Sequence, residues 1–94
     1  MNKIDYLTIS EGFVEILEVY KNLLSHESRE HVMHCLDNTE IEMACESFVL
    51  AMIEENLIVA PDDRQKLLNL CFIMRLDHES VFRSNFWDIA YPYL

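Results

Sequence analysis

The sequence of 94 residues is poor in residues that interrupt regular structure. It contains one glycine, Gly12, and two prolines, Pro61 and Pro92. An all-β sandwich or barrel needs a turn about every 8–12 residues, so this shortage of turn residues argues against one. A single glycine also cannot build a Gly-rich phosphate-binding loop, which excludes the common nucleotide-binding motifs.

Basic residues are scarce as well. Seven Lys and Arg stand against 17 Asp and Glu, and the formal net charge is −10 at pH 7. Nucleic acids and anionic membrane surfaces are bound through Lys and Arg, so we expect no direct nucleic-acid partner and no membrane partner. A negative field favours a basic protein partner, although acidity also serves solubility alone. The charge is uneven: residues 1–63 carry 14 acids and 3 bases, whereas residues 64–94 carry 3 acids and 4 bases.

Long hydrophobic runs and paired cysteines are also missing. The longest uninterrupted apolar run covers residues 48–53, far short of the roughly 20 residues that span a bilayer. The first residues lack the apolar segment of a signal peptide. Three cysteines, an odd number, each lie in a helical apolar pattern. We therefore expect reduced, buried cysteines in a cytoplasmic protein.

What the chain does have is a helical apolar period along most of its length, with 51% hydrophobic residues. This pattern predicts an all-α fold, a compact single-domain bundle of four to five short helices that occupies residues 1–94. The expected helices cover residues 10–24, 27–36, 38–55, 61–76 and 77–84. The aromatic tail, residues 86–94, is expected to pack over the bundle, because an exposed patch of that size favours aggregation.

Residues that favour helix starts precede these segments. They are Thr8 or Ser10 for the first helix, Ser25 for the second, Thr39 for the third and Pro61 for the fourth. Thr39 also has the capping-box spacing with Glu42. Asn56 is expected to end the third helix.

No motif predicts chemistry at a metal or at a nucleophile. His26 and His31 are five residues apart, so they do not share a helical face as the zinc-protease motif requires. His31, His34 and Cys35 do share one, but no further ligand is marked in the sequence. No serine or cysteine lies in a catalytic motif. We therefore expect a protein that is not an enzyme and binds neither a metal nor a cofactor.

Residues 39–77 carry a recognisable series of motifs. Residues 39–48 read TEIEMACESF, residues 53–63 read IEENLIVAPDD, and an amphipathic segment ending in MRLD follows at 74–77. This series resembles the small helical immunity proteins of bacterial contact-dependent growth inhibition and Maf toxin systems. Glu40, Ala44 and Glu46 match the pattern of that family, whereas Thr39 replaces its glycine and Phe48 its leucine. The resemblance covers nearly half of the chain.

The resemblance implies that the protein binds the C-terminal domain of a toxin in the cytoplasm and neutralises it. Many toxins of such systems are nucleases with basic surfaces, for which an acidic helical face would compete. Independently of the resemblance, the acids of the first and third helices, together with Asp37, Asp62 and Asp63, could form one continuous negative face. The residues we expect to bind the toxin are Glu15, Glu18, Glu40, Glu42, Glu46, Asp62 and Asp63, with Trp87, Tyr91 and Tyr93 as candidate aromatic anchors.

Other interpretations of the same residues remain open. Glu40 and Glu46 could instead serve the helix start and the fold. The acids could also be solvated outer faces with no partner. For the whole chain, one alternative is an acidic helical adaptor or dimerisation module without a toxin partner. Another is a nucleic-acid mimic that sequesters a DNA-binding protein. The sequence does not decide between a monomer and a dimer.

Overall fold

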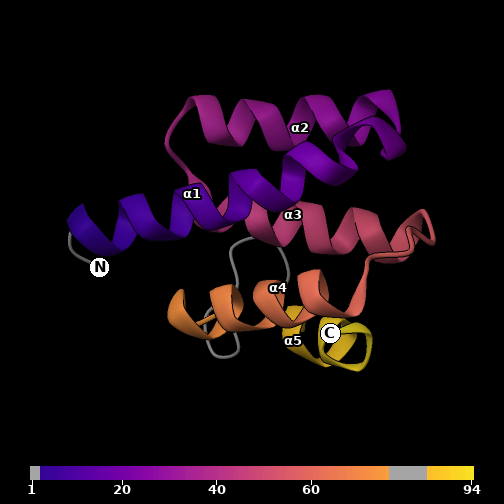
Figure 1. Cartoon of the computed structure of the whole chain (residues 1–94). Coiled ribbons are helices and arrows are strands. Elements are labelled where there is room, and N and C mark those ends of the chain that lie inside the picture. The colour runs from indigo at the N-terminus through magenta and orange to yellow at the C-terminus, as the bar shows by residue number, and fades with distance from the viewer. Residues whose placement is uncertain (1–2, 77–84) are drawn as a thin grey trace.

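The computed structural model describes residues 3–76 and 85–94, with side chains from Tyr6 onward. These residues form an all-α, single-domain bundle, as predicted, and no strand occurs among them (Figure 1). The helices are α1 (Lys3–Tyr20), α2 (His26–Asp37), α3 (Ile41–Glu54), α4 (Pro61–Ile73) and α5 (Phe86–Ala90), with short 3-10 helices at Lys21–Leu23 and Tyr91–Tyr93. None of the helices in this part of the chain combines the length and the apolar character that crossing a membrane requires.

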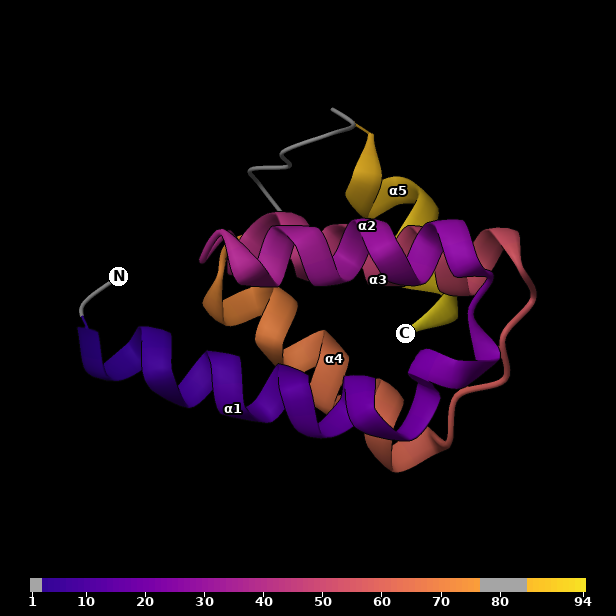
Figure 2. The same ribbon diagram turned by 90° about the horizontal axis from the view of Figure 1, so that it is seen from above.

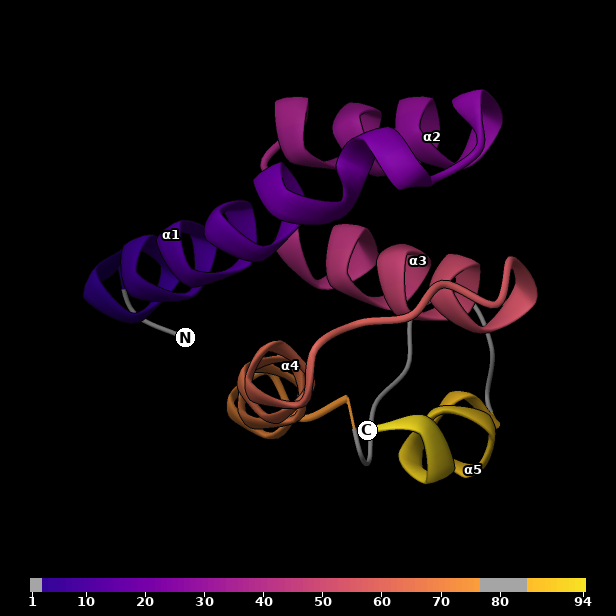
Figure 3. The same cartoon turned by 45° about the vertical axis from the view of Figure 1, so that its right-hand side comes forward.

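Helix α3 lies at the centre of the bundle. It contacts α1, α2 and α5, and Figure 3 shows it between α2 on one side and α4 and α5 on the other. Helices α2 and α3 form a hairpin with the most extensive interface of the fold. Helix α4 lies beside α1, as the view from above shows (Figure 2). A helix surrounded in this way has to be apolar on nearly all sides, which explains why α3 contains the longest apolar run of the sequence.

The core is continuous and aromatic at its centre. Phe13 of α1 and Phe48 of α3 are fully buried, and their rings meet edge to face at 5.8 Å between centroids. Phe86 of α5 is fully buried in the same cluster. Cys35, Cys45 and Cys71 are all free and buried, as predicted. The core therefore joins α1, α3 and the tail.

The first helix is longer than its sequence predicts. It begins at Lys3, so Thr8 and Ser10 lie inside α1 and the predicted cap at either residue is wrong. The reason is that Ile9 extends the buried stripe of Phe13 and Ile16 by another turn toward the N-terminus. Its end is close to the prediction, because the 3-10 helix carries the chain to Leu23.

Helices α2, α3 and α4 end alike, without glycine. The residue after each C-cap has a positive φ: 57° at Thr39, 53° at Asn56 and 62° at Arg75. The next residue's N–H then bonds back to a carbonyl three positions inside the C-cap, for example Leu57 N to Met52 O at 2.9 Å. This is the Schellman motif. It confirms Asn56 as the end of α3, but Thr39 closes α2 and does not cap α3, so that part of the prediction is wrong.

The other predicted boundaries can be compared directly. The Ser25 hydroxyl accepts a hydrogen bond from Ser28 N and caps α2, and Pro61 is the first residue of α4, both as predicted. The helix predicted over 77–84 lies outside the described residues. In the tail, Phe86 and Ala90 of α5 are buried, so this part packs as expected, whereas Tyr91 is 57% exposed.

Candidate functional site

The negative charge of the protein is concentrated on α1, α2 and α3. Residues 6–60 carry 11 acids and 2 bases, a net of −9. Residues 61–76 carry 2 acids and 3 bases, and residues 85–94 carry a single acid. The surface that can attract a basic partner therefore lies on the first three helices.

Glu46 is one of the predicted toxin-binding residues, and its predicted exposure at the surface is wrong. Its spacing of four residues from Glu42 predicts that both lie on the outer face of α3, but the Glu46 side chain is fully buried. Glu42 is exposed because it lies in the first turn, whereas Glu46 lies in the middle of α3, the helix that three others contact. Inside the protein, Glu46 is one of the causes that raise the pKa of the Cys45 thiol, after the hydrogen bond between Cys45 and Cys71, burial and the charge of Cys71. This burial agrees with the alternative given above, in which Glu46 serves the fold.

Asp63 is also engaged within the protein. Its Oδ2 accepts a hydrogen bond of 2.7 Å from the Tyr20 hydroxyl, and the same hydroxyl accepts one of 2.9 Å from Ala60 N. This arrangement ties the end of α1 to the start of α4. Burial, and then the bond to Asp63, raise the pKa of Tyr20, so its hydroxyl stays protonated and can donate at neutral pH. Asp63 thus has a structural task that a surface partner would have to disrupt.

The remaining predicted residues are exposed but do not come together. Glu40 and Glu42 lie at the start of α3, and Asp62 lies at the start of α4, beyond the opposite end of α3 (Figure 1). A helix of 14 residues is about 20 Å long, so these ends are well separated. Glu15 and Glu18 lie on the outer side of α1. The expected single continuous face through these residues is therefore not what the structure contains.

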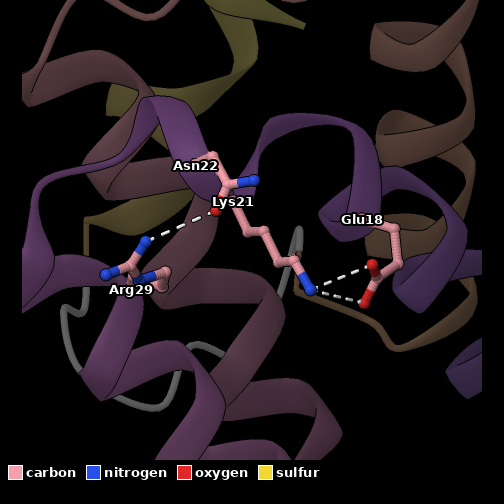
Figure 4. A network of polar contacts seen from close by, with 4 residues as sticks. All are labelled: Glu18, Lys21, Asn22 and Arg29. Atoms are coloured by element: carbon pink, nitrogen blue, oxygen red, sulfur yellow. Dashed lines mark hydrogen bonds and ion pairs between the residues drawn. The ribbon is translucent and has the colours of Figure 1, made fainter.

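Glu18 is already paired. Its carboxylate lies 2.9 Å from Lys21 Nζ, and the pair stands beside the contact of Arg29 Nη1 with Asn22 Oδ1 at 3.4 Å (Figure 4). Both members of the ion pair are on the surface, where such pairs contribute little. A cation of a partner protein that binds the Glu18 carboxylate more tightly would replace Lys21 in this ion pair.

The acids that the fold does bring together line a pocket between α2 and α3, which we call the α2–α3 pocket. It has a volume of about 330 Å³. Its residues follow helical spacing on both walls and are Glu27, Ser28 and His31 from α2 with Ser47, Leu50, Ala51 and Glu54 from α3. Glu27 and Glu54 are exposed, so two carboxylates stand at the opening on opposite helices.

A third acid locks the two helices together at this end. Glu55, the C-cap of α3, accepts hydrogen bonds from Ser25 N at 2.6 Å, from the Ser25 hydroxyl at 3.0 Å and from the Ser28 hydroxyl. The Ser28 bond and then the Ser25 N–H bond hold the pKa of Glu55 below its usual value, because each favours the charged carboxylate. The walls of the α2–α3 pocket are therefore fixed relative to one another.

One of the residues that line the pocket, Ser47, has a hydroxyl group whose hydrogen-bonding capacity is not satisfied. Ser47 is 9% exposed, and its buried Oγ meets no partner at hydrogen-bonding geometry. The Ser47 hydroxyl acts on the nearby Cys35 thiol. Burial and the charge of Glu40 raise the pKa of Cys35, and the Ser47 hydroxyl lowers it. A thiol is a weak partner, so Ser47 retains hydrogen-bonding capacity next to the pocket.

This arrangement suits a cationic side chain. Leu50 and Ala51 offer apolar contact to an aliphatic stem, and Glu27 and Glu54 offer carboxylates to an ammonium or guanidinium group. In the described part of the chain, no group of three or more His, Cys, Asp or Glu side chains could hold a metal ion.

Sequence reasoning missed both Glu27 and Glu54. Each stood in the sequence as a further acid on a helix. The available signal was the spacing of Ser47, Leu50, Ala51 and Glu54, which puts them on one face of α3. Only the pairing of that face with α2 brings Glu27 to it.

The chain shows no significant match to any protein-family model, to any curated protein or to any solved structure.

Proposed function

We propose that this chain is an immunity protein that binds and neutralises a basic nuclease toxin domain in the bacterial cytoplasm. The observation that carries the proposal is the α2–α3 pocket, in which Glu27 and Glu54 face a common opening on the most acidic part of the molecule. The motif resemblance of residues 39–77 supports the toxin as the partner.

Charge explains how such a complex would form. A negative surface raises the rate at which a positively charged protein associates, and it disfavours acidic competitors. A nuclease needs basic residues to hold its substrate, so the groups that an acidic inhibitor covers are those that the toxin requires. Inhibition follows when the substrate path is blocked, even if the catalytic centre is not entered.

The first test is co-expression with the toxin domain encoded directly upstream of this chain. Cells that produce both proteins should grow, whereas cells with the toxin domain alone should not. Equal killing with and without this chain would contradict the proposed function.

The second test locates the interface. The double substitution Glu27→Lys with Glu54→Lys should weaken toxin binding by at least 100-fold and flatten its dependence on salt, measured by calorimetry from 50 to 300 mM NaCl. The matched control is Glu11→Lys with Asp88→Lys, on exposed positions of α1 and α5 outside the predicted binding set, which changes the net charge equally. Equal losses in the two double variants would mean that net charge, and not the α2–α3 pocket, determines binding. Circular dichroism checks that both variants retain their helices.

The alternative, an adaptor or dimerisation module without a toxin, is favoured by an aromatic row on α4 and the tail. Phe72 and Trp87 have ring centroids 5.2 Å apart, and Trp87 and Tyr91 follow at 5.4 Å. Phe72 and Tyr91 are about half exposed. Sedimentation of the protein alone separates the two functions: a dimer that Tyr91→Ser and Phe72→Ser convert to a monomer would favour the adaptor.

A further inference from the structure

The two carboxylates of the α2–α3 pocket stand on different walls, Glu27 on α2 and Glu54 on α3. Both side chains are exposed, so an incoming group can reach them. Within the described part of the chain, neither carboxylate takes part in an ion pair or a side-chain hydrogen bond. Both therefore remain available to a cation that comes from outside the protein.

The protein places no cation of its own in this pocket. Among the described residues, those that line it include neither a lysine nor an arginine. The one base of residues 25–55, Arg29, contacts Asn22 and His26 instead. The 8 acids of that stretch thus have almost no positive charge to balance them, and such a surface attracts a cationic partner.

A second observation, independent of the acids, indicates a ligand in the same pocket. Ser47 lines the pocket and is 9% exposed, and its buried Oγ has no partner at hydrogen-bonding geometry. A buried polar group without a partner is unfavourable, so a ligand that brings a donor to it is stabilised. Rotation about the Cα–Cβ bond turns this hydroxyl, and it gives up no strong hydrogen bond when it turns.

The pocket is small, and its walls are already in place. Its volume of about 330 Å³ lies at the lower end of the roughly 300–1,000 Å³ of small-ligand sites, so it has room for one long side chain and not for a helix or strand. Glu55 holds the two walls together through Ser25 and Ser28. Such a preformed pocket selects an occupant by its shape, because no conformational ordering has to accompany binding.

We infer that the α2–α3 pocket takes one arginine side chain of the partner and prefers arginine to lysine. This inference rests on the proposed function for the source of the arginine, which is the toxin domain. The aliphatic stem lies against Leu50 and Ala51, and N–H groups on the two sides of the guanidinium donate to Glu27 and Glu54. The N–H groups at its tip face Ser47 at the inner end of the pocket.

The preference for arginine follows from the geometry of its donors. The guanidinium has five N–H groups that point in different directions within one plane, so it can serve carboxylates on two walls at once. An ammonium concentrates its donors at the end of the stem and is more strongly hydrated. A lysine with the same charge therefore binds more weakly between Glu27 and Glu54.

The test is an NMR titration of the ¹⁵N-labelled full chain with three small probes and without the toxin. The probes are the N-acetyl N-methylamides of arginine, lysine and citrulline, of which citrulline is the neutral counterpart of arginine. We expect saturable shifts at the amides of Ser28, Ser47 and Glu54 with the arginine probe, roughly threefold or weaker binding of the lysine probe, and no binding of the citrulline probe. Equal binding of arginine and lysine, or shifts confined to other surfaces, would overturn the inference.

Matched variants locate the bound probe. Glu27→Gln and Glu54→Gln should each weaken binding of the arginine probe roughly threefold or more. Glu30→Gln changes the charge equally at an exposed position of α2 that does not line the pocket, so it should leave binding unchanged. An equal loss in Glu30→Gln would mean that net charge alone attracts the probe, which overturns the inference.

Ser47→Ala tests whether the guanidinium enters the pocket. This substitution removes a hydroxyl that has no partner, so the fold should be retained, which circular dichroism checks. Binding of the arginine probe should weaken about twofold, because one hydrogen bond is lost. Unchanged affinity would mean that the guanidinium stays outside, and the inserted arginine would be wrong.

Two further results separate the possible sources of the guanidinium. Agmatine, a free guanidino compound, is expected to bind no more than about tenfold more tightly than the capped arginine; a larger advantage would mean a small-molecule site and would overturn the toxin as the source. A failed titration overturns this inference and leaves the proposed function standing. Failed protection in the co-expression test overturns the proposed function whatever the titration shows.

Discussion

The α2–α3 hairpin and the region of α4 and the tail differ in every property that decides what a surface binds. Residues 25–55 carry 8 acids and 1 base, whereas residues 57–76 and 85–94 together carry 3 acids and 3 bases. The hairpin exposes no large hydrophobic side chain, while the second region exposes Ile58, Phe72, Ile73, Tyr91 and Tyr93. The difference teaches that two kinds of surface can share one small core, the first suited to a cation and the second to an apolar segment.

Both regions depend on the same central ring. Phe48→Ala should lower the free energy of unfolding by about 3–5 kcal/mol, because it removes a fully buried ring and its edge-to-face contact with Phe13. Urea denaturation monitored by circular dichroism measures this loss. The control is Phe72→Ala, which removes a ring that is 47% exposed and should cost about 1 kcal/mol or less. Similar losses in the two variants would mean that Phe48 is not at the centre of the core.

The attachment of α4 to α1 is the next largest effect. Tyr20→Phe removes the hydroxyl that donates to Asp63 and accepts from Ala60 N, which leaves both partners unsatisfied. The expected loss is about 1–3 kcal/mol. Hydrogen exchange of the Ala60 amide should accelerate by more than that of the α2–α3 amides. Tyr91→Phe, at an exposed position, is the control that should leave both measurements unchanged.

Fold class and most helices could be predicted from the sequence, because the apolar stripes repeat at helical spacing. The start of α1 could not, since Ser10 is compatible with both a cap and a helix interior, and the buried contact of Ile9 decides the matter. Thr39 was misjudged for a similar reason. It precedes an acid-rich helix start, yet the Schellman closure of α2 takes it into a left-handed backbone conformation.

Of the candidate site, only its negative charge could be predicted from the sequence. Sequence reasoning identifies acids on helices, but burial depends on how many neighbours a helix has. For this reason Glu42 and Glu46, on one side of α3 by spacing, differ completely in exposure. The reverse holds for Glu27 and Glu54, which are 27 residues apart and face one pocket. Which residues of different helices lie close together is determined by tertiary packing, and the helical repeat of apolar residues does not predict it.

The lock at the pocket end of the hairpin predicts a pH dependence. Glu55→Gln removes charge-assisted hydrogen bonds to Ser25 and Ser28 and should destabilise the protein by about 1 kcal/mol at pH 7, because the site is only partly shielded from water. The folded-state pKa of Glu55 lies below its usual 4.5. Its contribution is therefore complete above about pH 5 and is lost as the pH falls through the folded-state pKa. The difference between wild type and variant in urea denaturation should shrink between pH 5 and pH 3. A difference that stays constant over this range would mean that the charge of Glu55 is not involved.

The smallest expected effect is an increase in stability. The same substitution, to glycine at a helix end, tests it in both regions. Thr39 and Arg75 close α2 and α4 with positive φ, where a side chain is strained and glycine is not. Thr39→Gly should stabilise the protein by about 0.5–1 kcal/mol, since the relief exceeds the entropy that glycine adds to the unfolded chain. Arg75→Gly should gain slightly less, because arginine is not branched at Cβ. Asn56→Gly should change little, as asparagine tolerates this conformation. Thermal unfolding ranks the three, and a larger gain at Asn56 than at Thr39 would show that strain at the helix ends is not what limits stability.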